Sequence, residues 1–209
     1  LILHEQPSQI AELDLDIPFN DHLIGESHYY ENKKINKPMD FSGKNYMNLV
    51  DQHNFLIQLI FPEISNSTSQ LQLTESDYKF LLREMSMLPR ESEFPKYGED
   101  YYDSYCKFFL YGDSKERMPE HVRIFNKVGL AYGFLLDNAY IVDLENKVEF
   151  FLSAVVYSNS NGVLNDDSYD YDTLTIPFLA EIGRAIYEYE LERNREFDPD
   201  LSHLDRIES

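Results

Sequence analysis

The sequence predicts an α+β fold in which a three-stranded antiparallel meander packs against a C-terminal helix. The stretch from Arg123 to Asn159 contains three apolar runs separated by short polar or glycine-containing segments, which is the pattern of consecutive antiparallel strands. From Thr175 to about Arg193, apolar residues recur every three or four positions, as in a helix with one buried face. Additional helices are predicted between residues 42 and 110.

The three predicted strands cover residues 123–128, 133–142 and 149–157. The third is apolar at nearly every position, so both of its faces must be covered, and we expect it to lie inside a sheet and not at its rim. Residues 143–147 have the polar composition of a hairpin loop. Residues 129–133 begin and end with glycine, which predicts a bend or a place where a ligand approaches the backbone.

Residues 1–41 are predicted to be irregular, because prolines and a glycine interrupt every apolar run. So long a stretch without regular elements is typical of a functional loop or of a segment that needs a missing partner. The chain also begins at Leu1 without a methionine. We therefore expect it to be a processed or truncated piece of a longer protein.

Three helices are predicted before the meander. The first opens at Ser42 and stops before Pro62. The second is capped by Thr74, with Asp77 three residues later. A third, rich in tyrosine and phenylalanine, is predicted around residues 101–110. The predicted core faces are Tyr46, Leu49, Val50, His53, Leu56, Ile57 and Ile60 on the first helix, and Tyr78, Leu81, Leu82, Met85 and Leu88 on the second.

The predicted C-terminal helix carries Pro177 in its first turn, where a missing backbone N–H costs nothing. The charged tail, residues 198–209, is expected to be frayed. The stripe predicted to face the sheet is Leu179, Ile182, Ile186 and Tyr189.

Composition excludes some classes of partner. Eighteen basic and 38 acidic residues give a formal charge of −20, which argues against nucleic acid and anionic membrane surfaces as partners. No apolar run approaches membrane-spanning length, and no signal peptide is recognisable. Cys106 is the only cysteine, so no internal disulfide forms. We expect no cofactor and no metal.

The run Asn126-Lys127-Val128-Gly129, followed by a meander and a terminal helix, resembles the last third of a serine β-lactamase. More broadly it is similar to the penicillin-recognising serine hydrolases, whose third motif is Lys-Thr/Ser-Gly on a strand at the edge of the active site. The resemblance covers residues 42–193 in order and spacing. It implies that the meander is part of a larger β-lactamase-like sheet, and that residues 42–197 are the C-terminal part of the hydrolase domain.

The resemblance also implies site residues. Lys127 places a cation beside the site, Gly129 keeps the strand edge bare for substrate, and the backbone N–H of Leu130 supplies half of an oxyanion hole. Val128 and Ala131 are the implied substrate-binding neighbours. Two departures concern the substrate carboxylate: Val128 has no hydroxyl, and the following strand carries no arginine.

In this family the nucleophile motif Ser-x-x-Lys and the second motif Ser-Asp-Asn precede the third motif by a distance that would place them before Leu1. This chain alone is therefore expected to be inactive. Ser104 to Lys107 spells Ser-x-x-Lys but lies too close to Lys127, and Tyr157-Ser158-Asn159 follows the third motif instead of preceding it. The implied partners are an acyl or peptide-like substrate, β-lactam and cell-wall compounds included, and the N-terminal part of the same protein. The implied location is periplasmic or otherwise exported.

Other interpretations stay open. A non-catalytic binding module using the same groove, or an acidic interaction domain without a site, would have the same composition. The six histidines show no zinc-binding spacing, and His53 on a helix face is typical of an ordinary core or surface histidine. Aspartates near residue 170 either bind calcium or favour a helix N-terminus. A tyrosine cluster either forms a stacking wall or packs at a helix–sheet interface. The two clusters are Asp166, Asp167, Asp170 and Asp172, and Tyr97, Tyr101, Tyr102 and Tyr105.

If strands are missing, residues 149–157 become an exposed apolar edge, which is an association hazard. We then expect the chain either to form a homodimer through that edge or to cover it with its own first forty residues.

Overall fold

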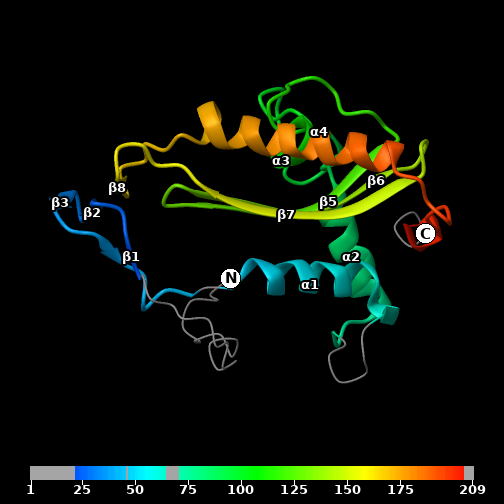
Figure 1. Cartoon of the computed structure of the whole chain (residues 1–209), viewed down its shortest axis with the longest axis horizontal. Helices are drawn as coiled ribbons and strands as arrows, with labels where there is room; N and C mark the ends of the chain where they lie inside the picture. The colour runs from blue at the N-terminus through cyan, green and yellow to red at the C-terminus, as the bar shows by residue number, and fades with distance from the viewer. Residues whose placement is uncertain (1–21, 46, 65–70, 205–209) are drawn as a thin grey trace.

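The computed structural model describes residues 22–45, 47–64 and 71–204 and has the predicted α+β class (Figure 1). Its centre is a three-stranded antiparallel sheet in the order β5-β6-β7. Register is continuous, with Lys127 opposite Asn138 and Asn138 opposite Ser153. The strands are β5 (Val122–Ala131), β6 (Phe134–Asp143) and β7 (Val148–Tyr157).

Helices cover both faces of this sheet. In Figure 1, α3 (Phe108–Tyr111) and α4 (Ile176–Glu192) lie above it, and α1 (Leu49–Ile60) and α2 (Glu75–Ser86) lie below. Successive residues of β6 point to opposite faces, so that strand contributes to both cores. The upper core contains Leu135, Ala139, Ile141, Phe109 and Leu179, and the lower core contains Tyr140, Val142, Phe125, Leu56 and Ile60.

The prediction that the third strand lies inside the sheet was wrong for the described residues, because β7 is at the sheet's edge. Its two faces are nevertheless covered, by α1 on one side and α4 on the other. The apolar run in β7 is therefore explained by the helices packed above and below it. A run of apolar residues indicates that both faces of a strand are buried, but it does not indicate whether the strand lies at the edge or the centre of its sheet.

The β5–β6 connection is tighter than predicted. β5 extends through Gly129 to Ala131, and only Tyr132 and Gly133 form the turn. Both have positive φ, 55° and 86°, as a two-residue type I′ hairpin requires. The predicted loop at 143–147 is confirmed, with the Asp143 carboxylate accepting the N–H groups of Glu145 and Asn146 at 2.9 Å each.

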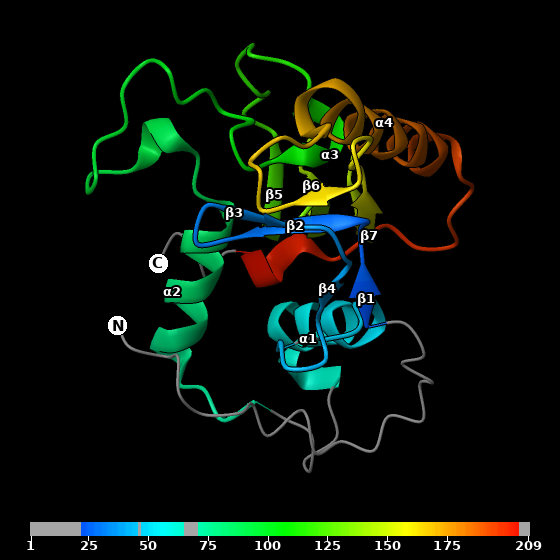
Figure 2. The same ribbon diagram turned by 90° about the vertical axis from the view of Figure 1, so that its left-hand side faces the viewer.

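Part of the N-terminal region predicted to be irregular contains short strands, while residues 1–21 lie outside the described part. β2 pairs in parallel with β8, a strand more than 130 positions later. No local pattern could show such a pairing. These strands lie at the end of the molecule where the β5–β6 hairpin turns (Figure 1, Figure 2). They are β1 (Leu23–Ile24), β2 (Ser27–Tyr30), β3 (Lys33–Ile35), β4 (Met39–Asp40) and β8 (Val163–Leu164).

The second predicted helix is confirmed, and the first begins later than predicted. In α2 the Thr74 hydroxyl accepts the N–H of Asp77, and the Asp77 carboxylate accepts the N–H of Thr74. Helix α1 begins at Leu49, not at Ser42, because Asn48 is its cap and accepts the N–H of Asp51 at 2.7 Å. It ends before Pro62, as predicted.

The predicted helix at 101–110 was wrong, since only α3, a four-residue turn with non-helical φ and ψ inside, is present. The buried Asp137 carboxylate accepts the N–H groups of Phe108 and Phe109 at 3.1 and 3.4 Å. Leu110 adopts a φ of 67°. A tertiary acceptor on β6 therefore replaces helical acceptors for these donors.

The C-terminal helix α4 is confirmed, with Pro177 in its first turn. It follows a single π-type turn, Tyr171–Thr175. Its buried face contains Leu179 and Gly183, whereas Tyr189 is 61% exposed, so the predicted stripe was wrong at that position. A Cβ on Gly183 would lie 2.6 Å from the Leu110 nitrogen, so only glycine permits this approach of helix to backbone.

The charged tail is not frayed as far as Leu204. Leu201–Leu204 form a short 3₁₀ helix, and Leu201 and Leu204 pack against the lower core. The His203 imidazole is 3.1 Å from the Tyr140 hydroxyl. Residues 205–209 lie outside the described part. In the described ranges, no helix combines the length and apolarity that crossing a membrane requires.

Candidate functional site

A groove of about 300 Å³ lies where β5 meets the end of α2 and the segment before α3. Lys127 and Val128 of β5 line it, together with Lys107 and Cys106. The groove thus contains two of the five site residues that the resemblance implies. Two carboxylates, Glu84 and Asp103, also line the groove, so its lining carries two acidic and two basic side chains.

Lys127 lies at the rim of this groove with an exposed side chain. Its ammonium donates to the carbonyl oxygen of Val128, which shows that this carbonyl points away from β6. In an antiparallel ladder, every second residue directs both its N–H and its carbonyl away from the paired strand. Leu130 has the same parity as Val128, so its N–H also points to the outer edge of β5.

The structure divides the five predicted site residues between two hollows. Lys127 and Val128 line the groove, whereas Leu130 and Ala131 line a second hollow of about 580 Å³ at the hairpin end. Gly129 lies between them. A Cβ built on Gly129 would meet no atom nearer than 3.9 Å, so packing does not require glycine at this position.

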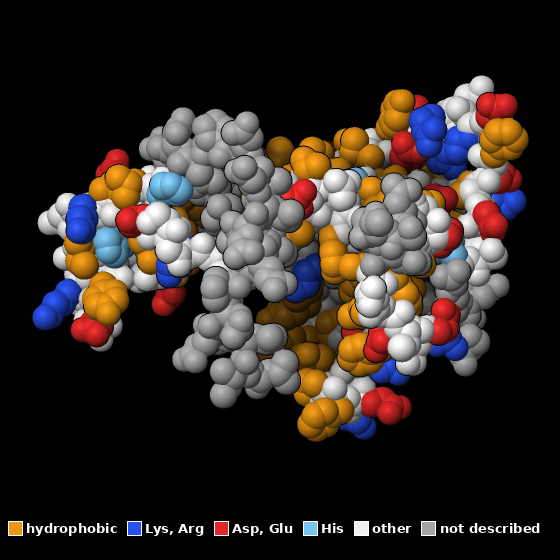
Figure 3. All heavy atoms as spheres, turned by 90° about the horizontal axis from the view of Figure 1, so that it is seen from below, with side chains coloured by type: hydrophobic (Ala, Val, Ile, Leu, Met, Phe, Trp, Pro, Cys, Tyr) orange, Lys and Arg blue, Asp and Glu red, His pale blue; other side chains and the backbone are white. Residues whose placement is uncertain are grey.

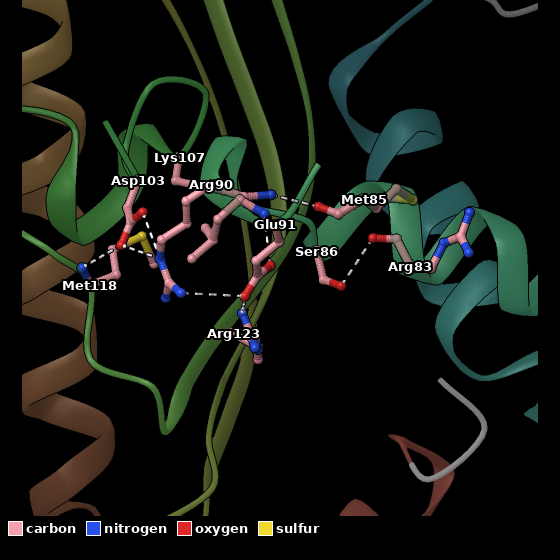
Figure 4. Close-up of polar contacts among 10 residues, drawn as sticks. Arg83, Met85, Ser86, Arg90, Glu91, Asp103, Lys107, Met118 and Arg123 are labelled. Carbon is pink, nitrogen blue, oxygen red and sulfur yellow. Dashed lines mark hydrogen bonds and ion pairs between the residues drawn. The ribbon is translucent and has the colours of Figure 1, made fainter. Parts of the chain in front are cut away.

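Behind the groove, a buried polar chain links β5, β6 and α2. The Lys107 ammonium donates to the Asn126 side-chain oxygen at 2.7 Å and to the Met85 carbonyl, a contact visible in Figure 4. The Asn126 amide in turn donates to Asp137 at 2.9 Å and to the Cys106 carbonyl at 2.7 Å. Every charged end of this chain therefore has a hydrogen-bond partner.

Burial shifts both ionisable ends of this chain toward neutrality. It lowers the pKa of Lys107 to about 8. It raises the pKa of Asp137 to about 6, even though Asn126 and two backbone N–H groups favour the carboxylate. Desolvation is the larger effect in each case, because Asp137 is fully buried and Lys107 is 4% exposed.

A second set of polar contacts fixes the wall of the groove, as Figure 4 shows. Arg90 donates to the buried Asp103 at 3.0 Å, and Asp103 also accepts the N–H of Met118 at 3.0 Å. The Glu91 carboxylate accepts from Arg123 of β5 at 2.8 Å. These contacts hold the segment after α2 against β5, so the groove has a fixed shape.

The tyrosine cluster forms an exposed wall and not a packed helix–sheet interface. Tyr97, Tyr101 and Tyr105 are 40–46% exposed. Their rings contact one another, with centroids 4.9 Å apart for the first pair and 4.8 Å apart for the second. Tyr97 and Tyr105 also line the groove. The expected interface is absent because the helix predicted at 101–110 does not form.

The two motif imitations are engaged in structural contacts. Ser104 is 1% exposed and its hydroxyl donates to the Ser114 carbonyl, while the Lys107 ammonium is bound elsewhere. The Ser158 hydroxyl is buried against that of Thr175. Neither serine is directed toward a base, so neither is prepared to act as a nucleophile.

Sequence reasoning missed a serine–histidine contact on the α1 side of the sheet. His53 Nδ1 lies 2.7 Å from Ser153 Oγ. Ser153 donates its proton to Asn138 at 2.6 Å, and Asn138 is oriented by donating to the Gln52 carbonyl at 2.9 Å. His53 must therefore donate to Ser153 and cannot act as its base in this arrangement. The two residues are 100 positions apart, so no local motif indicates the contact.

The aspartates before α4 mostly stabilise turns. Asp170 accepts the backbone N–H and the hydroxyl of Ser160 at 2.8 and 3.1 Å. Asp166 accepts from Asn161 and from the backbone of Ser168. Within residues 22–45, 47–64 and 71–204, no group of three or more His, Cys, Asp or Glu side chains could hold a metal ion. The calcium interpretation therefore has no support there.

Comparison with known proteins found no matching family model, no matching curated protein and no matching solved structure.

Proposed function

We propose that this chain is the C-terminal portion of a β-lactamase-like serine hydrolase that acts on an acyl or peptide-like substrate. It contributes the Lys127 strand and half of the oxyanion hole, and the N-terminal part of the same protein contributes the nucleophile. The observation that carries the proposal is the outer edge of β5, which has no strand partner among the described residues. There an exposed Lys127 borders a groove, and the Leu130 N–H points outward.

Each feature of that edge has a chemical role in acyl transfer. An outward N–H stabilises the negative oxygen that develops on a carbonyl carbon under attack. The Lys127 ammonium attracts a substrate carboxylate and stabilises the negative charge that develops on the serine oxygen as its proton leaves. Gly129, which packing does not require, leaves room for substrate backbone along the strand. Cell-wall peptides and β-lactams share this chemistry, and Val128 offers no hydroxyl to their carboxylates.

Two surfaces support the involvement of further residues of the same protein. The outer edge of β7 has no strand partner in the described part of the chain. The α1–α2 side of the molecule also exposes hydrophobic side chains (Figure 3). An apolar edge and apolar helix faces are typical of surfaces that another part of a protein covers. The resemblance to the penicillin-recognising serine hydrolases also implies a periplasmic or otherwise exported location. The exposed side chains are Val50, Phe55, Ile64 and Phe80.

The test is Lys127→Ala in the full-length protein, with turnover of an acyl or peptide-like substrate as the readout. We expect turnover to fall at least about tenfold, which corresponds to about 1.4 kcal/mol of transition-state stabilisation. Lys147→Ala is the matched control, because Lys147 is an exposed lysine in the β6–β7 loop. Equal turnover for the two variants would contradict the proposal, as would a fluorophosphonate adduct on Ser104 of this chain alone.

A non-catalytic binding module is the second candidate. It is favoured by the observation that Ser104, Ser153 and Ser158 all make structural contacts and none has a base. This candidate predicts that Lys127→Ala weakens ligand affinity while no turnover exists to be lost. An acidic interaction domain without a site predicts no effect of the substitution on either quantity.

A further inference from the structure

The second hollow is lined by residues of the β5–β6 hairpin and by Ile176 at the start of α4. Both of these elements lie at the left of Figure 1. The volume of the hollow is about 580 Å³. Three tyrosines line it: Tyr132 from the hairpin turn, Tyr169 from the loop after β8, and Tyr171 from the π-type turn. Two aspartates, Asp167 and Asp172, line it as well. Aromatic faces and carboxylates together form an environment suited to a cation.

Two of the three rings are held in place by their hydroxyl groups. The Tyr171 hydroxyl accepts the N–H of Gly133 at 2.9 Å and donates to the Phe134 carbonyl at 3.3 Å. The Tyr169 hydroxyl accepts the N–H of Asn165 at 2.8 Å, and its ring centroid is 5.3 Å from that of Tyr171. Because the phenol oxygens are occupied, these two side chains present their rings and not their hydroxyls as the available surface.

The charge of the hollow is not neutralised by its own lining. Asp167 and Asp172 form no hydrogen bond or ion pair through their carboxylates with any described residue, and no Lys or Arg lines the hollow. The N-terminus of α4 favours a carboxylate at Asp172. That effect does not account for Asp167 or for three tyrosines in the same hollow.

The ammonium group of Lys44 already contacts one of these rings, that of Tyr132. The Lys44 ammonium lies 5.5 Å from the centre of the Tyr132 ring and donates to its hydroxyl at 3.3 Å. Phe41 also packs edge-on against Tyr132, with centroids 5.1 Å apart. Tyr132 therefore already contacts one ammonium group, that of Lys44.

We propose that this hollow is a binding site for an organic ammonium group, whose charge faces Asp167 and Asp172 while its carbon substituents pack against Tyr132, Tyr169 and Tyr171. The site does not depend on the proposed hydrolase activity. It recognises the ligand's cation whether or not any bond is broken. If the chain does belong to a hydrolase, the adjoining Leu130 places this ammonium site next to the reacting carbonyl.

The experiment titrates this chain with choline chloride and, separately, with 3,3-dimethyl-1-butanol, a neutral molecule of the same shape. Calorimetry and NMR shifts of the tyrosine rings report binding without requiring turnover. We expect saturable binding of choline, with affinity for the neutral molecule at least about fivefold weaker, because cation–π and carboxylate attraction act only on the charge. Equal affinity for the two molecules, or no saturable choline binding, would overturn the proposal.

Substitutions in the hollow test whether choline binds there. The double substitution Asp167→Asn with Asp172→Asn should weaken choline binding at least about fivefold, since it removes both facing charges. The matched control is Asp100→Asn with Asp198→Asn, which changes the net charge equally at two exposed aspartates outside the hollow. Tyr132→Leu should also weaken binding, with unchanged far-UV circular dichroism confirming that the fold is retained. Equal losses in the two double variants would show that only overall charge matters, and would overturn the proposal.

Discussion

The groove and the hairpin-end hollow lie along the same strand, β5, but their charges are organised in opposite ways. In the groove, Lys107 is buried and its ammonium is hydrogen-bonded, and only Lys127 is exposed to a ligand. In the hollow, Asp167 and Asp172 have no cation among the lining residues. The ion-pair-free charge of the groove is therefore a lysine and those of the hollow are carboxylates, although Glu84 and Asp103 also line the groove.

Formal net charge therefore does not describe the surface that a ligand meets. Both carboxylates that line the groove already have arginine partners, Glu84 with Arg83 and Asp103 with Arg90, so Lys127 forms no ion pair with any described residue. The hollow retains free anions because its aspartates lie on a loop and a turn, away from the arginines. The two proposals together predict that a ligand with a carboxylate and an ammonium group would lie along β5 in a single direction.

The largest expected effect is a difference in the free energy of unfolding between variants of the two groove lysines. Lys107→Ala should lower the free energy of unfolding by about 3 kcal/mol, because it leaves a cavity and removes the cation bonded to Asn126 and Met85. Lys127→Ala should change it by less than about 0.5 kcal/mol, since Lys127 is exposed. Urea denaturation of both variants measures the difference. Similar losses would mean that the buried chain contributes no more stability than a surface lysine.

The next effect is a pH dependence that originates at Asp137. Its folded-state pKa, about 6, is above the ordinary 3.8 because the carboxylate is desolvated. The folded protein therefore binds this proton more tightly than the unfolded chain does. The contribution of Asp137 to stability is thus fully present below the unfolded pKa and is lost as the pH rises through about 6.

Urea denaturation of the wild type and of Asp137→Asn at several pH values measures this contribution as a difference. The advantage of the wild type should shrink by up to about 1.4 kcal/mol per pH unit between the two pKa values and be constant above them. Other acids are present in both proteins, so their pH-dependent contributions to the free energy of unfolding cancel in the difference. One example is Asp113, whose pKa is lowered by its hydrogen bond to Arg184. A difference that grows with pH would show that Asp137 is not the group with the raised pKa.

The smallest effect concerns the hollow. Asp167→Asn should leave the free energy of unfolding within about 0.5 kcal/mol of the wild-type value, because an exposed, unpaired carboxylate contributes little to stability. Thermal melting of Asp167→Asn beside Asp100→Asn provides the measurement. A large loss at Asp167 alone would mean that this carboxylate has a structural partner, and the contrast between groove and hollow would then weaken.

The sequence predicted those elements whose determinants are local. The apolar runs of β6 and β7, the capping box at Thr74 and Pro177 at the start of α4 each depend on residues within a few positions of one another. At the candidate site, the run from Lys127 to Leu130 could be singled out. Its strand alternation also implies which backbone groups face outward once the hairpin turn is known.

Local sequence patterns therefore specify the α+β class, the meander and the helix that closes it, because strand and helix periods act along the chain. The position of β7 at the edge of the described sheet and the hydrogen bond from the Phe108 N–H to Asp137 both depend on tertiary contacts. So does the division of Leu130 and Lys127 between different hollows. These features are contacts between residues far apart in the chain. The free energies of these contacts depend on which surfaces of the chain come together. The spacing of residue types along the sequence does not indicate which surfaces those are.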